Sequence, residues 1–217
     1  IVAGVEEGEF RDRAMLGLPG RQPELIDAVA ATGKPTVVVL IGGSAITMPW
    51  LEKAGAVLDA WYPGEAGGEA VADVLFGDIS PSGKLPLTFP KSLDQLPPFE
   101  EYSMERRTYR YMTEEPLYPF GFGLSYGCFE YSDLQLEKTE VAAGDSLQLR
   151  LTLRNSSDRD SAEVVQFYLS DLQAATVVPL HHLIGFERVF LKAGESCSVT
   201  FTLTAEMMSF YDDDGKL

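Results

Sequence analysis

The spacing of apolar residues changes partway along this 217-residue chain, and that change limits the folds open to it. Residues 35–43, PTVVVLIGG, form an unbroken apolar run. A strand that is apolar on both faces is typical of the middle of a covered, mostly parallel sheet. In residues 147–155, LQLRLTLRN, apolar and polar residues alternate, which is typical of strands with one face in water. The sequence therefore predicts two domains of different class.

The segments around the apolar run alternate between helix and strand signals. In residues 22–33, Pro23 suits a first helical turn and Gly33 suits the C-terminal cap. Residues 49–55 predict a short helix, and residues 56–64 predict a second buried strand. The apolar residues at helical spacing in the first helix are Leu25, Ile26 and Val29. This alternation predicts a doubly wound α/β domain with a mostly parallel sheet.

A further helix is predicted over residues 67–77, and Gly77 suits its end. Its expected inward residues are Val71, Val74 and Leu75. We place the α/β domain at residues 1–95, with its start incomplete, because the chain has no initiator Met and opens in an apolar segment. Residues 96–122 carry little periodicity but many prolines and tyrosines. We expect them to form an ordered connecting strap laid over the first domain, because their aromatic rings need a surface to pack on.

Residues 123–217 carry the period of two that predicts an antiparallel β-sandwich. The inward positions are Leu147, Leu149, Leu151, Leu153, Val165, Phe167, Leu169, Cys197, Val199, Phe201 and Leu203. Cys197 is therefore expected to be a small buried apolar residue. The chain ends in the turn-like segment DDDGKL, so we expect this domain to be incomplete and the whole sequence to be part of a longer protein.

Charge and residue counts argue against several functions. With 33 acidic against 17 basic residues, the formal net charge is -16. Such a charge repels phosphate backbones and anionic lipid, so neither nucleic acid nor a membrane is an expected partner. The two cysteines and the adjacent His181 and His182 offer no disulfide framework and no metal-ligand spacing. These counts therefore predict no metal site, and no organic cofactor is expected from the resemblance given below.

Two short motifs invite catalytic or phosphate-binding readings that do not hold. Ser44 follows two glycines, but Ile46 stands where a nucleophile elbow needs another glycine, so Ser44 is expected to be a strand-end hydroxyl. Residues 63–70, PGEAGGEA, lack the Lys-Ser/Thr pair of a phosphate-binding loop. A stand-alone nucleotide-binding domain is therefore not favoured.

Residues 5–22, VEEGEFRDRAMLGLPGRQ, concentrate carboxylates and guanidinium groups just after an expected strand. Open α/β sheets bind ligands at the carboxyl ends of their strands. Arginines beside carboxylates can separate the carboxyl pKa values, as acid–base catalysis requires. The residues alone do not exclude a solvated loop in which Asp12 and Arg13 pair locally, and taken alone they favour it.

Several segments resemble the C-terminal half of glycoside hydrolase family 3, the β-glucosidase and β-xylosidase family. They occur in the family's order over essentially the whole chain, and include residues 9–29 (EFRDRAMLGLPGRQPELIDAV), 60–90 (AWYPGEAGGEAVADVLFGDISPSGKLPLTFP) and 118–126 (YPFGFGLSY). The resemblance implies a catalytic (β/α)8-type barrel, then an α/β sandwich domain, then a fibronectin type III-like β-sandwich. This chain matches the second and third, whereas the barrel with its nucleophilic Asp has no counterpart in it.

The resemblance also assigns roles within the loop. The family's general acid/base is a Glu that precedes an Asp-Arg pair leading into an LPG segment, and Glu9, Asp12 and Arg13 match these positions. Phe10 stands where the family has a small residue, so Glu7 is the fallback acid/base. Asp12 and Arg13 would shape the loop near the site.

The resemblance implies the C-terminal part of a retaining exo-acting β-glycosidase that hydrolyses terminal β-linked sugars. Among such enzymes it favours a β-glucosidase. Its partners would be a β-glucoside or oligosaccharide substrate and the barrel domain of the same protein. Retaining enzymes use two carboxyl groups about 5–5.5 Å apart, so this chain alone is expected to be inactive. The alternative is a non-catalytic carbohydrate-binding or scaffolding segment, in which Asp12 and Arg13 form a structural ion pair.

Overall fold

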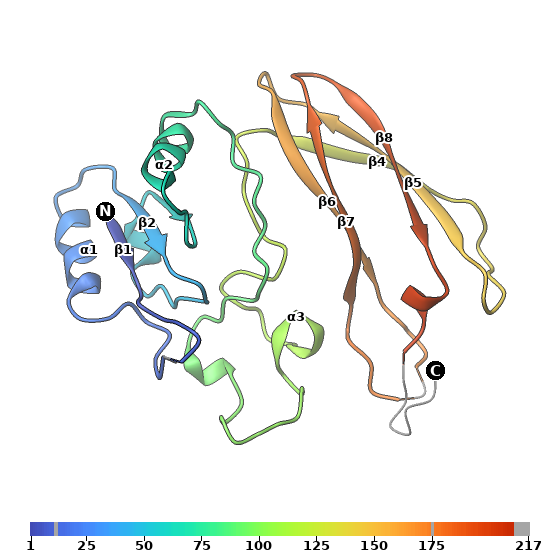
Figure 1. Cartoon of the computed structure of the whole chain (residues 1–217), viewed down its shortest axis with the longest axis horizontal. Coiled ribbons are helices and arrows are strands. Elements are labelled where there is room, and N and C mark those ends of the chain that lie inside the picture. The colour runs from blue at the N-terminus through green and yellow to red at the C-terminus, as the bar shows by residue number, and fades with distance from the viewer. Residues whose placement is uncertain (11–12, 175, 211–217) are drawn as a thin grey trace. The chain divides into compact units, whose positions relative to one another are not determined.

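The computed structural model describes residues 1–10, 13–174 and 176–210. The chain divides into two compact units, here called the α/β unit and the β unit (Figure 1). The α/β unit comprises Ile1–Asp78, Leu85–Thr108 and Met112–Phe120. The β unit comprises Ile79–Lys84, Tyr109–Tyr111 and Gly121–Leu217.

Three parallel strands form the sheet of the α/β unit, in the order β1-β2-β3. β1 spans Val2–Gly4, β2 spans Val37–Ile41 and β3 spans Ala56–Asp59. The predicted apolar run is the central one of these described strands, and Val38 and Leu40 are completely buried. The second predicted strand is present, but β3 is only partly buried because it has one neighbour among the described strands. Its expected full burial was wrong.

Helix α1 spans Gln22–Ala30 and places Pro23 in its first turn, as predicted. Its core-facing residue is Ile26, which is fully buried, whereas Leu25 is 52% exposed. Leu25 therefore does not belong to the core face. The helix is capped at Ala31, and Gly33 follows in a left-handed turn with φ +72°. A short 3-10 turn at Leu51–Lys53 replaces the predicted short helix after β2.

Helix α2 spans Gly67–Phe76 and ends at Gly77, whose φ of +84° only a glycine adopts readily. Leu75 was expected to face inward, but it is 43% exposed. Val71 and Val74 are partly buried, so the covered stripe of this helix is narrower than its apolar spacing implied. None of the helices described here is long and apolar enough to cross a membrane.

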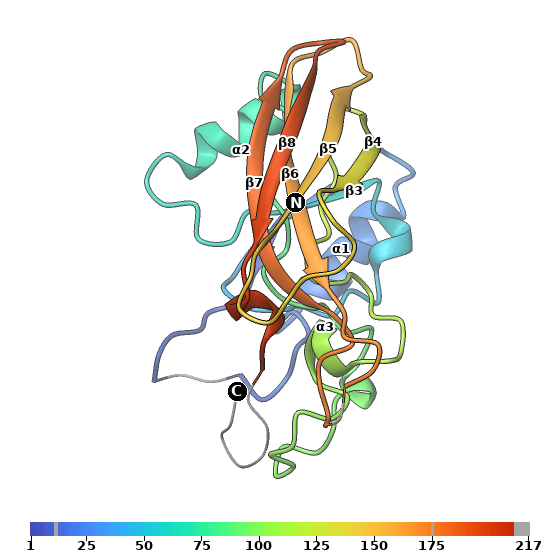
Figure 2. The same ribbon diagram turned by 90° about the vertical axis from the view of Figure 1, so that its right-hand side faces the viewer.

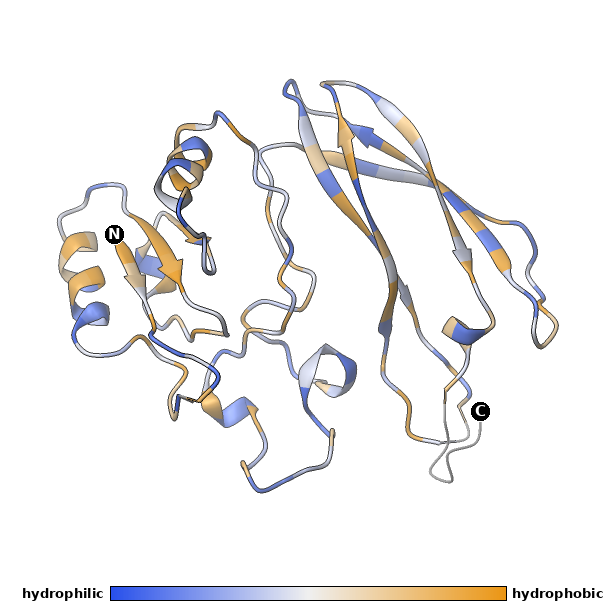
Figure 3. Cartoon of the chain, viewed as in Figure 1, coloured by the Kyte–Doolittle hydropathy of each residue, from blue (hydrophilic) through white to orange (hydrophobic). Residues whose placement is uncertain are grey.

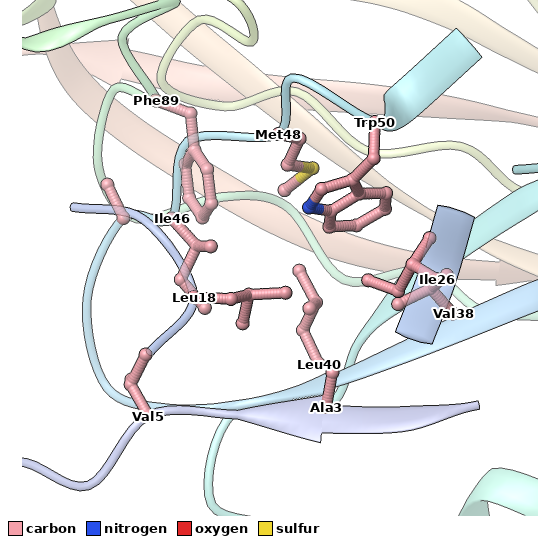
Figure 4. Close-up of a cluster of buried hydrophobic side chains, with 11 residues drawn as sticks. Ala3, Val5, Leu18, Ile26, Val38, Leu40, Ile46, Met48, Trp50 and Phe89 are labelled. Atoms are coloured by element: carbon pink, nitrogen blue, oxygen red, sulfur yellow. The ribbon is translucent and has the colours of Figure 1, made fainter. Parts of the chain in front are cut away.

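The core of the α/β unit gathers side chains from the sheet, from α1 and from the segment after β2 (Figure 4). Trp50 is 2% exposed and Phe89 is 1% exposed. Fully burying an apolar side chain stabilises a fold by about 1.5–3 kcal/mol. The other buried members are Ala3, Val5, Leu18, Ile26, Val38, Leu40, Ala45, Ile46 and Met48.

A 3-10 turn at Leu93–Gln95 precedes the segment expected to be a strap, which contains a short helix, α3, at Thr108–Tyr111. Not all its aromatic rings pack, since Phe99 and Tyr102 are each 91% exposed. The Arg107 guanidinium donates hydrogen bonds to the carbonyls of Pro98, Glu101 and Ser103. The hydrogen bonds of Arg107 therefore hold this stretch together, and both aromatic rings remain exposed to solvent.

The β unit contains two antiparallel sheets (Figures 1 and 2). One has the order β4-β5-β8, with β4 at Phe129–Leu136, β5 at Leu147–Asn155 and β8 at Ser196–Leu203. The other pairs β6 (Ser161–Leu169) with β7 (His182–Leu191). A last 3-10 turn follows at Glu206–Met208.

The predicted alternation holds in the β unit, as the alternating colours of its strands show (Figure 3). Leu147, Leu151 and Leu153 of β5 are buried, while Gln148 and Arg150 between them are exposed. Cys197 is only partly buried, and this burial raises the pKa of its thiol. The buried cluster between the sheets consists of Leu151, Leu153, Val165, Phe167, Leu191 and Val199.

An ion pair lies among the partly and fully buried residues of the β unit. Lys84 Nζ lies 3.0 Å from Glu163 Oε1 of β6 and donates to the Gly123 carbonyl at 2.9 Å. The Lys84 and Glu163 side chains are only 17% and 10% exposed. Burial and the charge of Glu163 together raise the pKa of Tyr131. This pair fastens the segment Ile79–Lys84 to the rest of the β unit.

Candidate active-site loop

The carboxyl ends of the three parallel strands bring three segments together. The first is the β1 loop, defined here as residues 5–15, of which 11 and 12 lie outside the described residues. The second is residues 42–45 after β2, and the third is residues 60–62 after β3. Because open α/β sheets bind ligands at this edge, it is the candidate functional site of the α/β unit.

Glu7 is a firmly anchored carboxylate of the β1 loop. Its Oε1 accepts a hydrogen bond from the Gly43 amide at 2.5 Å. Its Oε2 accepts one from Ser44 Oγ at 2.7 Å and lies 2.8 Å from Arg13 Nε. Both carboxylate oxygens are therefore engaged, and the side chain is only 15% exposed.

Arg13 completes the same cluster from the other arm of the loop. Its Nη2 donates to Ser44 Oγ at 2.5 Å and to the Ala45 carbonyl at 2.8 Å. Its side chain is 13% exposed. Ser44 thus bridges Glu7 and Arg13, and both histidines belong to the β unit, so Ser44 has the role of a strand-end hydroxyl.

The pKa of Glu7 is lowered by this environment. Partial burial alone would raise it, but hydrogen bonds from Ser44 and Gly43 and the Arg13 charge outweigh that effect. A carboxyl group with a lowered pKa is ionised near neutral pH and is a poor proton donor there.

Tyr62 closes the cluster from the third strand. Its hydroxyl lies 3.5 Å from Glu7 Oε1. A Cβ at Gly43 would lie 2.7 Å from Tyr62 Cε2, so the close approach requires glycine at this position. Trp61, the preceding residue, has φ +51°, a left-handed conformation that costs a non-glycine residue about 1 kcal/mol or more. Strained backbone of this kind is often found at functional sites.

Gln22 holds the base of the loop. Its side-chain amide accepts from the Gly4 amide at 2.7 Å and donates to the Gly4 carbonyl at 2.9 Å. This pair of hydrogen bonds imitates a strand partner at the end of β1. The predicted motif included Gln22, but its role was not predicted, since residues 18 positions apart give no local signal.

The other predicted site residues have different surroundings. Glu9 is exposed, and it makes no hydrogen bond or ion pair with any residue that the structure describes. Phe10 beside it is 96% exposed. Asp12 lies outside the described residues. Within residues 1–10, 13–174 and 176–210, no group of three or more acidic, His or Cys side chains could hold a metal ion.

Comparison with known protein families gives two matches. The model of the glycosyl hydrolase family 3 C-terminal domain matches residues 1–126. The model of a fibronectin type III-like domain matches residues 163–217. The first match covers more than half of the chain and contains the whole β1 loop.

Individual proteins agree with these matches. The chain is 44% identical over 202 residues to a xylan 1,4-beta-xylosidase from Xylanibacter ruminicola, covering 93% of this chain and 23% of that protein. It is 41% identical over 219 residues to thermostable beta-glucosidase B from Acetivibrio thermocellus, covering 95% and 29%. The crystal structure of a Bifidobacterium adolescentis GH3 beta-glucosidase superposes with a TM-score of 0.88 at 38% identity, covering 98% and 34%. The chain thus spans about a third or less of these proteins.

Proposed function

The chain belongs to glycoside hydrolase family 3, and on this premise we propose that it is the C-terminal part of a retaining exo-acting β-glycosidase, first of all a β-glucosidase. The observation that carries the proposal is the match of nearly the whole chain to proteins named as beta-glucosidase and beta-xylosidase. The substrate would be a terminal β-linked glucoside or oligosaccharide. No metal or organic cofactor takes part in the proposed chemistry.

Glu9 is the proposed general acid/base. Retaining glycosidases use one carboxylate as nucleophile and a second carboxyl group that first donates a proton and then removes one from water. The donor must be protonated and free to reach the glycosidic oxygen. The exposed position of Glu9 supports this role, whereas Glu7 has both oxygens engaged and a lowered pKa.

The nucleophile would come from the barrel domain of the same protein. A glycosyl-enzyme intermediate needs that second carboxylate, so the residues of this chain would supply half of the catalytic pair. The barrel domain is therefore the proposed partner of the β1 loop.

The test uses the native protein that contains this chain, with Glu9→Gln and, as a control for charge, Glu52→Gln on the exposed 3-10 turn after β2. Poor leaving groups need acid assistance and good ones do not, so Glu9→Gln should slow phenyl β-glucoside hydrolysis by roughly 10²–10⁴-fold. It should spare glycosylation by 2,4-dinitrophenyl β-glucoside. Azide, which needs no base, should restore turnover and give a β-glycosyl azide.

Near-normal rates of Glu9→Gln on poor leaving groups would show that another residue donates the proton. The purified 217-residue chain, checked by mass, should not hydrolyse aryl β-glucosides, and turnover by it would contradict the two-domain mechanism. No aryl β-glycosidase activity in the native protein would favour a non-catalytic scaffolding or carbohydrate-binding role.

A further inference from the structure

We propose that Glu7 and Arg13 form a clasp that positions the β1 loop, so that Glu7 acts on the reaction through Glu9 and does not donate the proton itself. The proposal rests on the role proposed for Glu9. It assigns Glu7 a positioning function in place of the fallback acid/base role that the sequence suggested.

The first argument is that the two clasp residues bracket Glu9. Glu7 precedes it by two positions and Arg13 follows it by four. Both side chains bind the same short segment after β2, since Glu7 accepts from Gly43 and Ser44, and Arg13 donates to Ser44 and Ala45. The described parts of the loop on both sides of Glu9 are therefore bound to the same edge of the sheet.

The second argument concerns the points at which the described part of the loop is attached to the rest of the α/β unit. Gln22 fixes the chain to Gly4 at the base of the loop, and the clasp fixes it again nearer to Glu9. Each added attachment shortens the free segment and lowers the number of positions that Glu9 can take. A catalytic group that is held in a productive position contributes through proximity and orientation, and a misplacement of about 1 Å can lower the rate on the order of 10²-fold.

The third argument is that the clasp is integrated into the sheet edge and is not a loose surface ion pair. The Glu7 and Arg13 side chains are both mostly buried, and the Tyr62 ring packs close against Gly43. Compared with apolar residues of similar size, a mostly buried ion pair adds little net stability, although removing one partner is costly because it leaves the other charge unpaired. Its arrangement is therefore better explained by the geometry it imposes than by the stability it adds.

The experiment uses the native protein that contains this chain, with Glu7→Gln, Arg13→Lys and the double variant, and Glu52→Gln as the control. Glu7→Gln keeps the size of the side chain but removes the charge opposite Arg13 and one acceptor. We expect kcat for phenyl β-glucoside to fall by roughly 10–100-fold with KM changed by less than about 3-fold, since orientation and not substrate binding is lost. The 2,4-dinitrophenyl substrate should show a much smaller loss in its first step.

Two readouts separate positioning from proton donation. Azide should not rescue Glu7→Gln, because Glu9 still acts as the base, whereas a β-glycosyl azide from this variant would overturn the proposal. The double variant should cost little more than either single variant, because both changes break the same clasp. Fully additive losses would contradict a shared role.

Amide hydrogen exchange tests the clasp independently of catalysis. Glu7→Gln and Arg13→Lys should each speed exchange in residues 5–10 and 13–15 and at the Gly43 amide, while Glu52→Gln should not. Unchanged exchange would refute the clasp even if Glu9 is the acid/base. Faster exchange with unchanged kcat on phenyl β-glucoside would refute the positioning role. Failure of the Glu9→Gln test alone refutes the proposed function and leaves the exchange result intact.

Ser44→Ala keeps the proposal testable if the Glu7 variant does not fold. It removes the hydroxyl that joins Glu7 to Arg13 but keeps both charges. The same pattern of faster exchange and lower kcat is expected, to a smaller extent. No change in either quantity would contradict the clasp.

Discussion

Glu7 and Glu9 lie two residues apart on the same loop, yet their surroundings prepare them for opposite tasks. Glu7 accepts hydrogen bonds from Gly43 and Ser44 and faces Arg13, so it remains an anchored anion. Glu9 is exposed and is unpaired with any described residue. The difference arises from contacts made 36 and 37 positions away, so neighbouring sequence could not distinguish the two carboxylates.

Glu7→Gln should lower the free energy of unfolding at neutral pH. It should also make this free energy vary less with pH in the acid range. Hydrogen bonds and the Arg13 charge hold the folded-state pKa of Glu7 below its ordinary value of 4.5. A carboxylate with a lowered pKa stabilises the fold above its unfolded-state pKa, and this contribution is lost as pH falls through the folded-state pKa. The variant should lose about 1–3 kcal/mol at neutral pH, and this deficit should shrink as the pH falls below the ordinary carboxyl pKa and through the lowered pKa of Glu7.

Urea denaturation of the 217-residue chain, followed at a series of pH values, measures this difference. Glu52→Gln should parallel the parent at every pH. A deficit of Glu7→Gln that stays constant down to the lowest pH would show that its charge is not what stabilises the loop.

Gly43→Ala should destabilise the α/β unit, because the added Cβ would lie 2.7 Å from Tyr62 Cε2 and 3.2 Å from Glu7 Oε1. Overpacking of this kind costs typically about 1–3 kcal/mol. Gly8→Ala is the matched control within the same loop, since its Cβ would meet no described atom within 4 Å and its φ is not positive. Thermal unfolding should therefore separate the two variants, and equal melting temperatures would contradict the close approach.

At the scale of elements, the periodicity of the sequence predicts the strands and helices better than it predicts which of their residues are buried. The apolar run forms β2 and the alternating stretch forms β5. Each pattern fits one environment, because an apolar run needs cover on both faces and an alternating strand needs cover on one face only. Leu75 and Tyr102 were expected to pack but are exposed. An apolar side chain is covered only if a neighbouring element reaches it, and that depends on the whole fold. The contacts of Glu7 and Gln22 were missed for the same reason.

Helix α2 offers a direct test of local geometry in its two adjacent glycines. A Cβ at Gly67 would lie 2.6 Å from Pro63 Cγ, whereas one at Gly68 would meet no described atom within 4 Å. Gly68→Ala should stabilise the chain by roughly 0.5–1 kcal/mol, because alanine favours the helix more than glycine does. Gly67→Ala should gain less or lose stability. Differential scanning calorimetry decides the order, and a more stable Gly67→Ala would contradict the packing of Pro63 on α2.

At the scale of the whole molecule, the chain passes between the two units several times. It changes unit after residues 78, 84, 108, 111 and 120, so the β unit includes two short segments from earlier in the sequence. The domain boundaries that we placed at residues 95 and 122 from the sequence remain a proposal, because they divide the chain into consecutive domains and the two compact units do not follow the chain in that way. The segment Ile79–Lys84 matters most, because Lys84 neutralises the mostly buried Glu163.

Lys84→Met should therefore lower the stability of the β unit by about 3 kcal/mol, since it leaves the Glu163 carboxylate mostly buried and unpaired. Lys84→Met combined with Glu163→Leu should recover much of that loss, because no buried charge remains. Chemical denaturation of the three proteins gives the comparison. If the double variant is as unstable as the single one, the packing of the lysine side chain, and not its charge, accounts for the stability that Lys84 contributes.

The position of Lys84 also constrains how this protein can exchange parts with its relatives. A recombination breakpoint near residue 120 would transfer Glu163 but leave Lys84 behind with the parental sequence. Such a chimera would inherit a sandwich that depends on a lysine it does not carry, unless the recipient has a lysine at the same place. Residues 121–217 therefore do not form a self-contained unit. Their stability depends on the six-residue stretch Ile79–Lys84, which comes before most of the β unit in the sequence.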